Sequence, residues 1–296
     1  MSYAPHESLA DPARKSAELW RLGLGLFAGV LIWMGLTSAV FAVVGFVGGD
    51  AGAVAFRDAV IDPSTPGGTL YQLFMIGMML ISVAVVADQL HGRSFWSVTG
   101  PLRAAARDFL RVLGAMALLY LVIGLLPPWE MAAPVEPNLT PQAWLGLLPL
   151  SLLALFLQVS AEEVVFRGYL QQQLAARLRS PVLWLGLPSV LFALGHYAPS
   201  DFPGNAALIA LWAGCFGLAA ADLTARTGNL GAAVGLHFAS NFSAVLVTAL
   251  PGPLSGLALY TLGIEPADTD AIRAVLPVDL LLLFCGWLTA RIALRR

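Results

Sequence analysis

The sequence predicts an all-α, polytopic membrane protein with about eight transmembrane helices and both termini in the cytoplasm. Of its 296 residues, 58% are hydrophobic and only 11% are charged, whereas soluble proteins carry about 25% charged residues. The mean hydropathy is +0.78. The apolar residues form unbroken runs longer than a membrane-spanning strand needs, without the alternation of an outer-membrane barrel. The spanning elements are therefore expected to be helices.

Eight apolar segments are long enough to cross a bilayer when the chain is scanned with a window of about 19 residues. Stretches rich in proline and glycine, which stop helices, separate several of them, most clearly at 62–68, 127–141 and 251–253. Asp279 interrupts the eighth segment, and Pro277 just before it favours a helix start near the membrane interface. The predicted spans are 22–48, 69–87, 110–128, 142–162, 182–198, 205–224, 229–250 and 274–290.

Basic residues are distributed unevenly between the loops that join these segments. Loops on one side hold only Arg57 and Arg273. Because Lys and Arg are retained on the cytoplasmic side, the asymmetry predicts cytoplasmic termini and a multi-pass protein of the cell's inner or plasma membrane. The basic residues assigned to the cytoplasm are Arg14, Lys15, Arg21, Arg93, Arg103, Arg107, Arg111, Arg177, Arg179, Arg226, Arg291, Arg295 and Arg296.

Charge, cysteine content and the lack of repeats argue against several functional classes. The formal net charge of −2 is too balanced to indicate a nucleic-acid partner. Cys215 and Cys285 lie in apolar sequence and form no CxxC pair, so neither a disulfide framework nor a thiolate metal site is expected. No internal repeat is visible, which argues against a secondary transporter, since many transporters are built from two related halves.

Three clusters of polar side chains interrupt the apolar segments, where ionisable groups are costly and mark function. At the end of the fourth segment, Glu163 and Arg167 are four residues apart on one helical face, in the orientation of a structural ion pair. Glu162 is rotated by about 100° from Glu163 and is free for chemistry. The other clusters contain His196 in the fifth segment, and His237 and Asn241 in the seventh.

The hairpin between the fourth and fifth segments allows the first two clusters to meet. If the chain turns at Ser180, Glu162 and His196 lie at similar depth, roughly 25 Å from the turn. This requires a fourth helix that is long or kinked. A turn near Asn229 brings His237 to a comparable level. The three clusters are therefore expected to converge.

In this order and membrane setting, the patterns Glu162-Glu163-x-x-x-Arg167, Phe192-x-x-x-His196 and His237-x-x-x-Asn241 resemble the three motifs of the CPBP family of intramembrane proteases. That family includes the CAAX prenyl endopeptidases, or Ras-converting enzymes, and the bacterial Abi proteins. The resemblance covers about 80 residues. It implies a single membrane domain over 1–296, a protease core at about 142–250, and a membrane-associated peptide or protein substrate.

The resemblance implies that Glu162 and His196 activate water while His237 and Asn241 stabilise the oxyanion, with Glu163 and Arg167 supporting the site. These chemical roles suit a buried carboxylate, imidazole rings and an amide. A metalloprotease-like version would use Glu162, His196 and His237 as ligands of a catalytic zinc. The spacing does not choose between them, and a site without a cofactor is favoured. The alternative function is a proton-coupled transporter or an inactive scaffold of the same fold.

Overall fold

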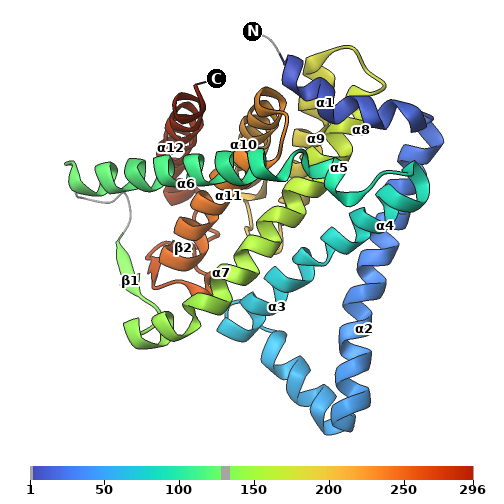
Figure 1. The fold of residues 1–296 in the computed structure, drawn as a ribbon. Coiled ribbons are helices and arrows are strands. Elements are labelled where there is room, and N and C mark those ends of the chain that lie inside the picture. Colours follow the sequence, from blue (N-terminus) through green and yellow to red (C-terminus); the bar gives the residue numbers. More distant parts are fainter. Residues whose placement is uncertain (1–2, 128–133, 296) are drawn as a thin grey trace.

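The computed structural model describes residues 3–127 and 134–295, and it confirms the all-α polytopic class. Six helices in these ranges are long and apolar enough to cross a membrane, and two shorter apolar helices, Pro181–Gly195 and Gly231–Val247, occupy the fifth and seventh predicted spans. Both described ends of the chain lie toward the same end of the molecule (Figure 1). Pro128, which closes the third predicted span, and Arg296 lie outside the described residues.

The long helices follow the predicted apolar segments. Figure 1 shows their arrangement. Two of the elements, η3 and η4, are π-helical. The first joins α7 to α8 without a break, and the second directly continues α11. In chain order the elements are η1 (Ala4–His6), α1 (Glu7–Ala10), η2 (Asp11–Ser16), α2 (Leu19–Val60), α3 (Pro66–Gly77), α4 (Met79–His91), α5 (Phe95–Thr99), α6 (Leu102–Leu125), β1 (Val135–Pro137), α7 (Pro141–Glu163), η3 (Val164–Leu170), α8 (Gln171–Ala175), α9 (Pro181–Gly195), α10 (Ala206–Thr227), α11 (Gly231–Asn241), η4 (Phe242–Val247), β2 (Thr248–Ala249), η5 (Ser255–Leu257), β3 (Tyr260–Leu262) and α12 (Thr269–Leu294).

A single glycine ends the first membrane span. Gly49 has φ 63° and ψ −169° inside α2, a conformation that residues with a side chain rarely adopt. The chain bends sharply there, and the remainder of α2 leads into α3 (Figure 1). The predicted first span, 22–48, therefore ends at the bend.

The fourth helix is long, as the hairpin argument requires. It begins at Pro141, whose missing N–H is harmless in a first turn, and the Thr140 hydroxyl accepts a hydrogen bond from the Ala143 N–H. It then runs through η3 to Ala175 as one apolar element. Its last part carries the first motif.

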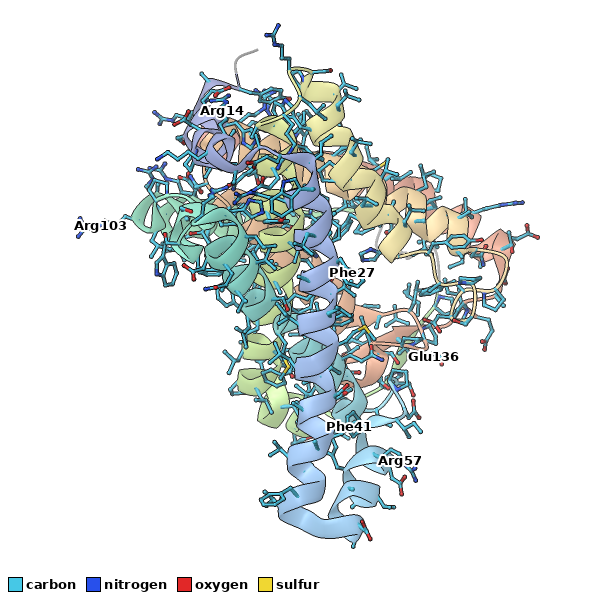
Figure 2. The ribbon with its side chains drawn as sticks, turned by 90° about the vertical axis from the view of Figure 1, so that its right-hand side faces the viewer. Arg14, Phe27, Phe41, Arg57, Arg103 and Glu136 are labelled. Carbon is cyan, nitrogen blue, oxygen red and sulfur yellow. The ribbon has the colours of Figure 1, made fainter. Side chains whose placement is uncertain are left out.

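Apolar side chains of α2 point away from the rest of the protein. Phe46 is 92% exposed and Phe27 63%, a surface suited to lipid and not to water. Arg14 and Arg57 lie near opposite ends of this helix (Figure 2). The cytoplasmic location of the termini stays a prediction.

Two hydrophobic clusters form the interior, one around α3, α4 and α7 and the other around α6, α10, α11 and α12. Phe166 of η3 packs against both clusters. The segment that carries the first motif therefore lies between the two halves of the core. Side chains on this segment can contact helices from both halves.

The prediction that Asp279 lies near a helix start is wrong. The helix begins ten residues earlier, at Thr269, where the Asp268 carboxylate accepts hydrogen bonds from the N–H groups of Asp270 and Ala271. Pro277 is inside the helix. The N-cap at Asp268 supplies the start signal, so Asp279 lies within the span.

A small three-stranded sheet, which the sequence does not predict, covers one end of the helices. Its strand order is β1-β3-β2, with β1 antiparallel to β3 and β2 parallel to it. Strands of two or three residues are too short to produce a hydrophobic period. As the last strand in this order, β2 has only β3 as a partner strand.

The N-terminal segment packs across the ends of several helices. His6 is buried and stacks on Trp184 of α9, with the ring centroids 4.7 Å apart. Tyr3 donates a hydrogen bond of 2.8 Å to the Asp222 carboxylate, which also accepts one from Trp287 of α12. The segment thereby joins α9, α10 and α12.

Lowering the pH is expected to loosen this segment. Burial lowers the pKa of His6 to about 4, and the neighbouring Glu7 opposes this only in part. His6 is neutral when the N-terminal segment is packed on the helices. The packed state is therefore most stable above pH about 6.5, and it loses stability as the pH drops toward about 4. A spin label on Ser8→Cys, in a chain without its two native cysteines, should become more mobile over that interval.

The matched control is His6→Phe, which can stack on Trp184 but cannot titrate. Its spin-label spectrum should not change between pH 7 and pH 4. The same transition in this variant would show that another group causes the loosening.

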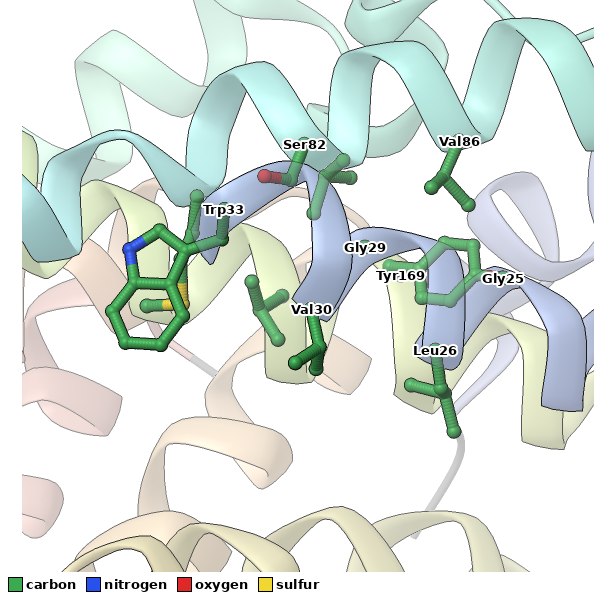
Figure 3. A pocket seen from close by; sticks show the side chains of 11 residues that line it. Gly25, Leu26, Gly29, Val30, Trp33, Ser82, Val86 and Tyr169 are labelled. Carbon is green, nitrogen blue, oxygen red and sulfur yellow. The ribbon is translucent and has the colours of Figure 1, made fainter. Parts of the chain in front are cut away.

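The hydroxyl of Tyr169 in η3 lies against α2 at a position that has no side chain. Tyr169 is hydrogen-bonded to His91 of α4 at 2.9 Å, and His91 to Ser16 at 2.8 Å. A Cβ atom on Gly25 would overlap the Tyr169 hydroxyl. Figure 3 shows the two residues beside an apolar cavity of about 100 Å³. Gly25 thus permits α2 to pack closely on the segment that carries the first motif.

We expect Gly25→Ala to lower the free energy of unfolding by about 1–3 kcal/mol, the usual cost of overpacking. Gly29→Ala, one turn along α2, is the matched control, because its Cβ would meet only Val86 at 3.9 Å. Thermal unfolding in detergent measures both variants. Equal unfolding temperatures for them would contradict the proposed packing constraint.

Candidate active site

The three motifs converge at places where helices end or change their pitch. Glu162 and Glu163 are the last residues of α7, and the chain continues as the π-helix η3. Asn241 is the last residue of α11 and is followed by the π-helix η4. Single-turn π-helical segments are rare and occur often at functional sites. Both helices therefore change from α-helical to π-helical geometry directly after their motif residues.

The predicted ion pair between Glu163 and Arg167 is confirmed. Arg167 Nη1 donates to Glu163 Oε1 at 3.1 Å, and both side chains are fully buried. Arg167 also donates to the Gly217 carbonyl at 3.1 Å and lies over the Phe192 ring, 4.7 Å from its centroid. The guanidinium thus connects the first motif with α9 and α10.

His237 lies between the two glutamates, a contact that the spacing does not reveal. Its Nδ1 is 2.7 Å from Glu163 Oε1, and its Nε2 is 3.6 Å from Glu162 Oε2. Glu162 Oε2 is buried and has no hydrogen-bond partner in the part of the chain that the structure describes. Through these two contacts His237 connects the third motif to both glutamates of the first.

Asn241 binds a side chain that sequence reasoning missed. Its Nδ2 donates to Gln158 Oε1 at 3.2 Å. Gln158 precedes Glu162 by four residues, which places it one turn back on the same face of α7. That spacing could have identified it. A primary amide carries two N–H donors, so this bond leaves Asn241 with a second one.

His196 lies at the edge of the cluster, and its predicted place inside the fifth span is wrong. The helix α9 ends at Gly195, and His196 is its C-cap. Its Nδ1 lies 2.8 Å from the Phe192 carbonyl oxygen, which can only accept, so Nδ1 carries a proton. Among the described residues no hydrogen bond or ion pair joins His196 to the other motif side chains. The Phe192 ring contacts both His196 and His237 and so connects His196 to the cluster.

The described residues do not form a zinc site. No group of three or more His, Cys, Asp or Glu side chains within residues 3–127 and 134–295 has a metal-binding arrangement. Nδ1 of His237 is bound to Glu163, and only Glu162 faces its Nε2. A catalytic zinc needs about three protein ligands at one point, and the set of Glu162, His196 and His237 does not meet this requirement here.

Comparison with known proteins supports the motif resemblance. Residues 144–243 match the sequence model of a family described as type II CAAX prenyl endopeptidase Rce1-like. This region contains all three motifs. The predicted resemblance to CAAX-type membrane proteases is thereby confirmed for this part of the chain.

A curated relative is the uncharacterized protein YyaK of Bacillus subtilis (strain 168), which is 30% identical over 102 residues. The match spans 33% of this chain and 33% of that protein, about a third of its length. No solved structure matches the chain.

Proposed function

We propose that the chain is an intramembrane endopeptidase that cleaves membrane-associated peptides or proteins, because residues 144–243 match the sequence model of the Rce1-like type II CAAX prenyl endopeptidase family. The observation that carries the proposal is the buried, unpartnered oxygen of Glu162 beside Nε2 of His237. An unpaired buried acceptor can take a proton from water. The surrounding groups supply the other functions that hydrolysis requires.

In the proposed reaction, Glu162 takes one proton from water while the resulting hydroxide oxygen forms a bond to the scissile carbonyl carbon. His196 holds the water's other hydrogen through Nε2, because its Nδ1 already donates to Phe192. Glu162 then returns its proton to the leaving amine as the C–N bond breaks. The products are a new carboxyl group and a new amine, so atoms and charges balance.

The oxyanion that forms on the carbonyl is stabilised by donors from α11. His237 offers Nε2–H when both of its ring nitrogens carry a hydrogen, and Asn241 offers its second amide hydrogen. Glu163 and Gln158 act as positioning residues, since they hold His237 and Asn241 through the bonds at 2.7 and 3.2 Å. Fixed donors of this kind stabilise developing negative charge more than water does.

The test is hydrolysis by purified protein in liposomes. A set of membrane-anchored peptides is incubated with the wild type and with Glu162→Gln, and mass spectrometry identifies new termini. Cleavage by the wild type alone supports the proposal. A wild type that cleaves nothing but moves protons across the liposome membrane would favour the transporter alternative.

Removal of metal ions is expected to leave activity largely unchanged. Because the motif residues do not meet as three ligands, the proposed reaction uses no metal. Protein treated with a strong chelator should keep most of its rate and contain well below one equivalent of zinc by elemental analysis. Stoichiometric zinc whose removal and return switch the activity off and on would overturn the metal-free mechanism and leave the protease assignment standing.

A further inference from the structure

An open cavity of about 450 Å³ lies beside the motif helix α11 and is lined by residues of α6, α10, η4, β2 and α12. Its volume falls within the range of pockets that bind small ligands or side chains. Most of its lining is aliphatic. Six polar side chains also line it, and these are Tyr120, Trp212, Ser240, Ser243, Thr248 and Asp279.

Asp279 is an acid without a partner. It lies in the interior of α12 and has no hydrogen bond or ion pair among the described residues. In contrast, Asp222 of α10 binds Arg226 at 2.8 Å and accepts hydrogen bonds from Tyr3 and Trp287. A charged group at the centre of a span costs about 2.5–3.5 kcal/mol. Asp279 is exposed at the cavity, so its unpaired carboxylate is accessible to a cationic group from outside the chain.

The other polar groups of the cavity are arranged for a peptide. The Trp212 indole N–H is buried and has no acceptor among the described residues, so it is available to a carbonyl oxygen. The cavity therefore offers one free donor and one free anionic acceptor, as a peptide with a basic side chain requires.

The cavity lies close in the sequence and in space to residues of the third motif. Ser240 precedes Asn241 and lies one helical turn after His237. Trp212 stacks on Phe216 at 5.7 Å between centroids, and Phe216 lies 4.6 Å from the His237 ring. The rings of Trp212 and Phe216 therefore connect a group bound here to His237.

An edge strand forms part of the cavity wall. Thr248 and Ala249 of β2 line it, and within the described residues β2 pairs with β3 alone. The free edge of such a strand can pair with an extended peptide. An extended backbone is also what a protease needs for access to the scissile bond.

We propose that this cavity is the specificity pocket of the enzyme, which accepts a Lys or Arg side chain of a substrate peptide held extended along β2, with Asp279 as the counter-ion. The proposal rests on the proposed peptidase function. It goes beyond that function by stating a charge preference of the substrate. Asp279 is a specificity residue and takes no part in bond breaking.

The experiment measures binding and cleavage separately, in full-length protein in liposomes. Binding uses the Glu162→Gln background and fluorescent, membrane-anchored peptides that differ at one position, which carries Lys, norleucine or Glu and is moved along the sequence. At one position, Lys should bind at least 10-fold more tightly than norleucine. Asp279→Asn should remove this difference, and Asp279→Lys should transfer the preference to Glu.

Two further variants distinguish specificity from folding. Asp270→Asn alters an exposed acid at the start of the same helix and should leave the Lys preference intact. Asp279→Glu keeps the charge and should keep the preference. In cleavage, Asp279→Asn should raise KM for the Lys peptide at least 10-fold with little change in kcat.

The outcomes separate the two proposals. Equal binding of the Lys, norleucine and Glu peptides at every position would overturn the pocket assignment, even if all are cleaved. A preference for Lys that persists in Asp279→Asn would also overturn it. Charge-dependent binding without cleavage by the wild type would refute the peptidase function and leave a cation-binding pocket.

Discussion

Glu162→Gln is expected to reduce peptide hydrolysis by about 10²- to 10⁴-fold, the contribution of a general base. The substitution keeps the size of the side chain but removes its ability to take a proton. The fold should be little affected, because Glu162 Oε2 has no hydrogen bond to lose. The unfolding temperature should therefore stay within a few degrees of the wild-type value while the rate falls.

Glu265→Gln is the matched control, since Glu265 is exposed in the loop before α12. Its rate should equal that of the wild type. Single-turnover measurements at saturating peptide would locate the defect in the chemical step. If Glu162→Gln retained more than a tenth of the wild-type rate, Glu162 would not be the base.

Local geometry explains which part of the site could be predicted from the sequence. The Glu163–Arg167 pair depends only on helical spacing, since residues four apart face each other, and it forms even though the helix becomes π-helical between them. The contact between Glu163 and His237 joins residues 74 positions apart. It depends on how α7 and α11 are rotated about their axes, which spacing alone does not determine.

The positions of the membrane spans could be predicted from hydropathy alone, but the residues at which the helices begin and end could not. The fifth helix stops at Gly195 because the His196 side chain binds the Phe192 carbonyl, an interaction that a hydropathy window does not detect. Asp279 was assigned to a helix start because Pro277 is typical of a first turn. The N-cap at Asp268 determines the actual start.

Arg167→Met is expected to lower the free energy of unfolding by about 3–5 kcal/mol, the cost of leaving a buried charge without its partner. The side chain is fully buried, so neither water nor lipid headgroups can replace its charge. Glu163 would keep only His237 as a partner. Arg179→Met is the matched control, because Arg179 is exposed in the turn before α9. Thermal or denaturant unfolding measures both.

Exchanging the two charges tests whether Glu163 only stabilises Arg167. If the ion pair had only a structural role, the double variant Glu163→Arg with Arg167→Glu would recover much of the stability that a single substitution loses. Because Glu163 Oε1 also lies 2.7 Å from His237 Nδ1, the exchange places a cation against that ring and removes its acceptor. We therefore expect little recovery of stability and no hydrolysis. Full recovery of both would show that His237 does not depend on Glu163, and the proposed positioning of the oxyanion donor would be wrong.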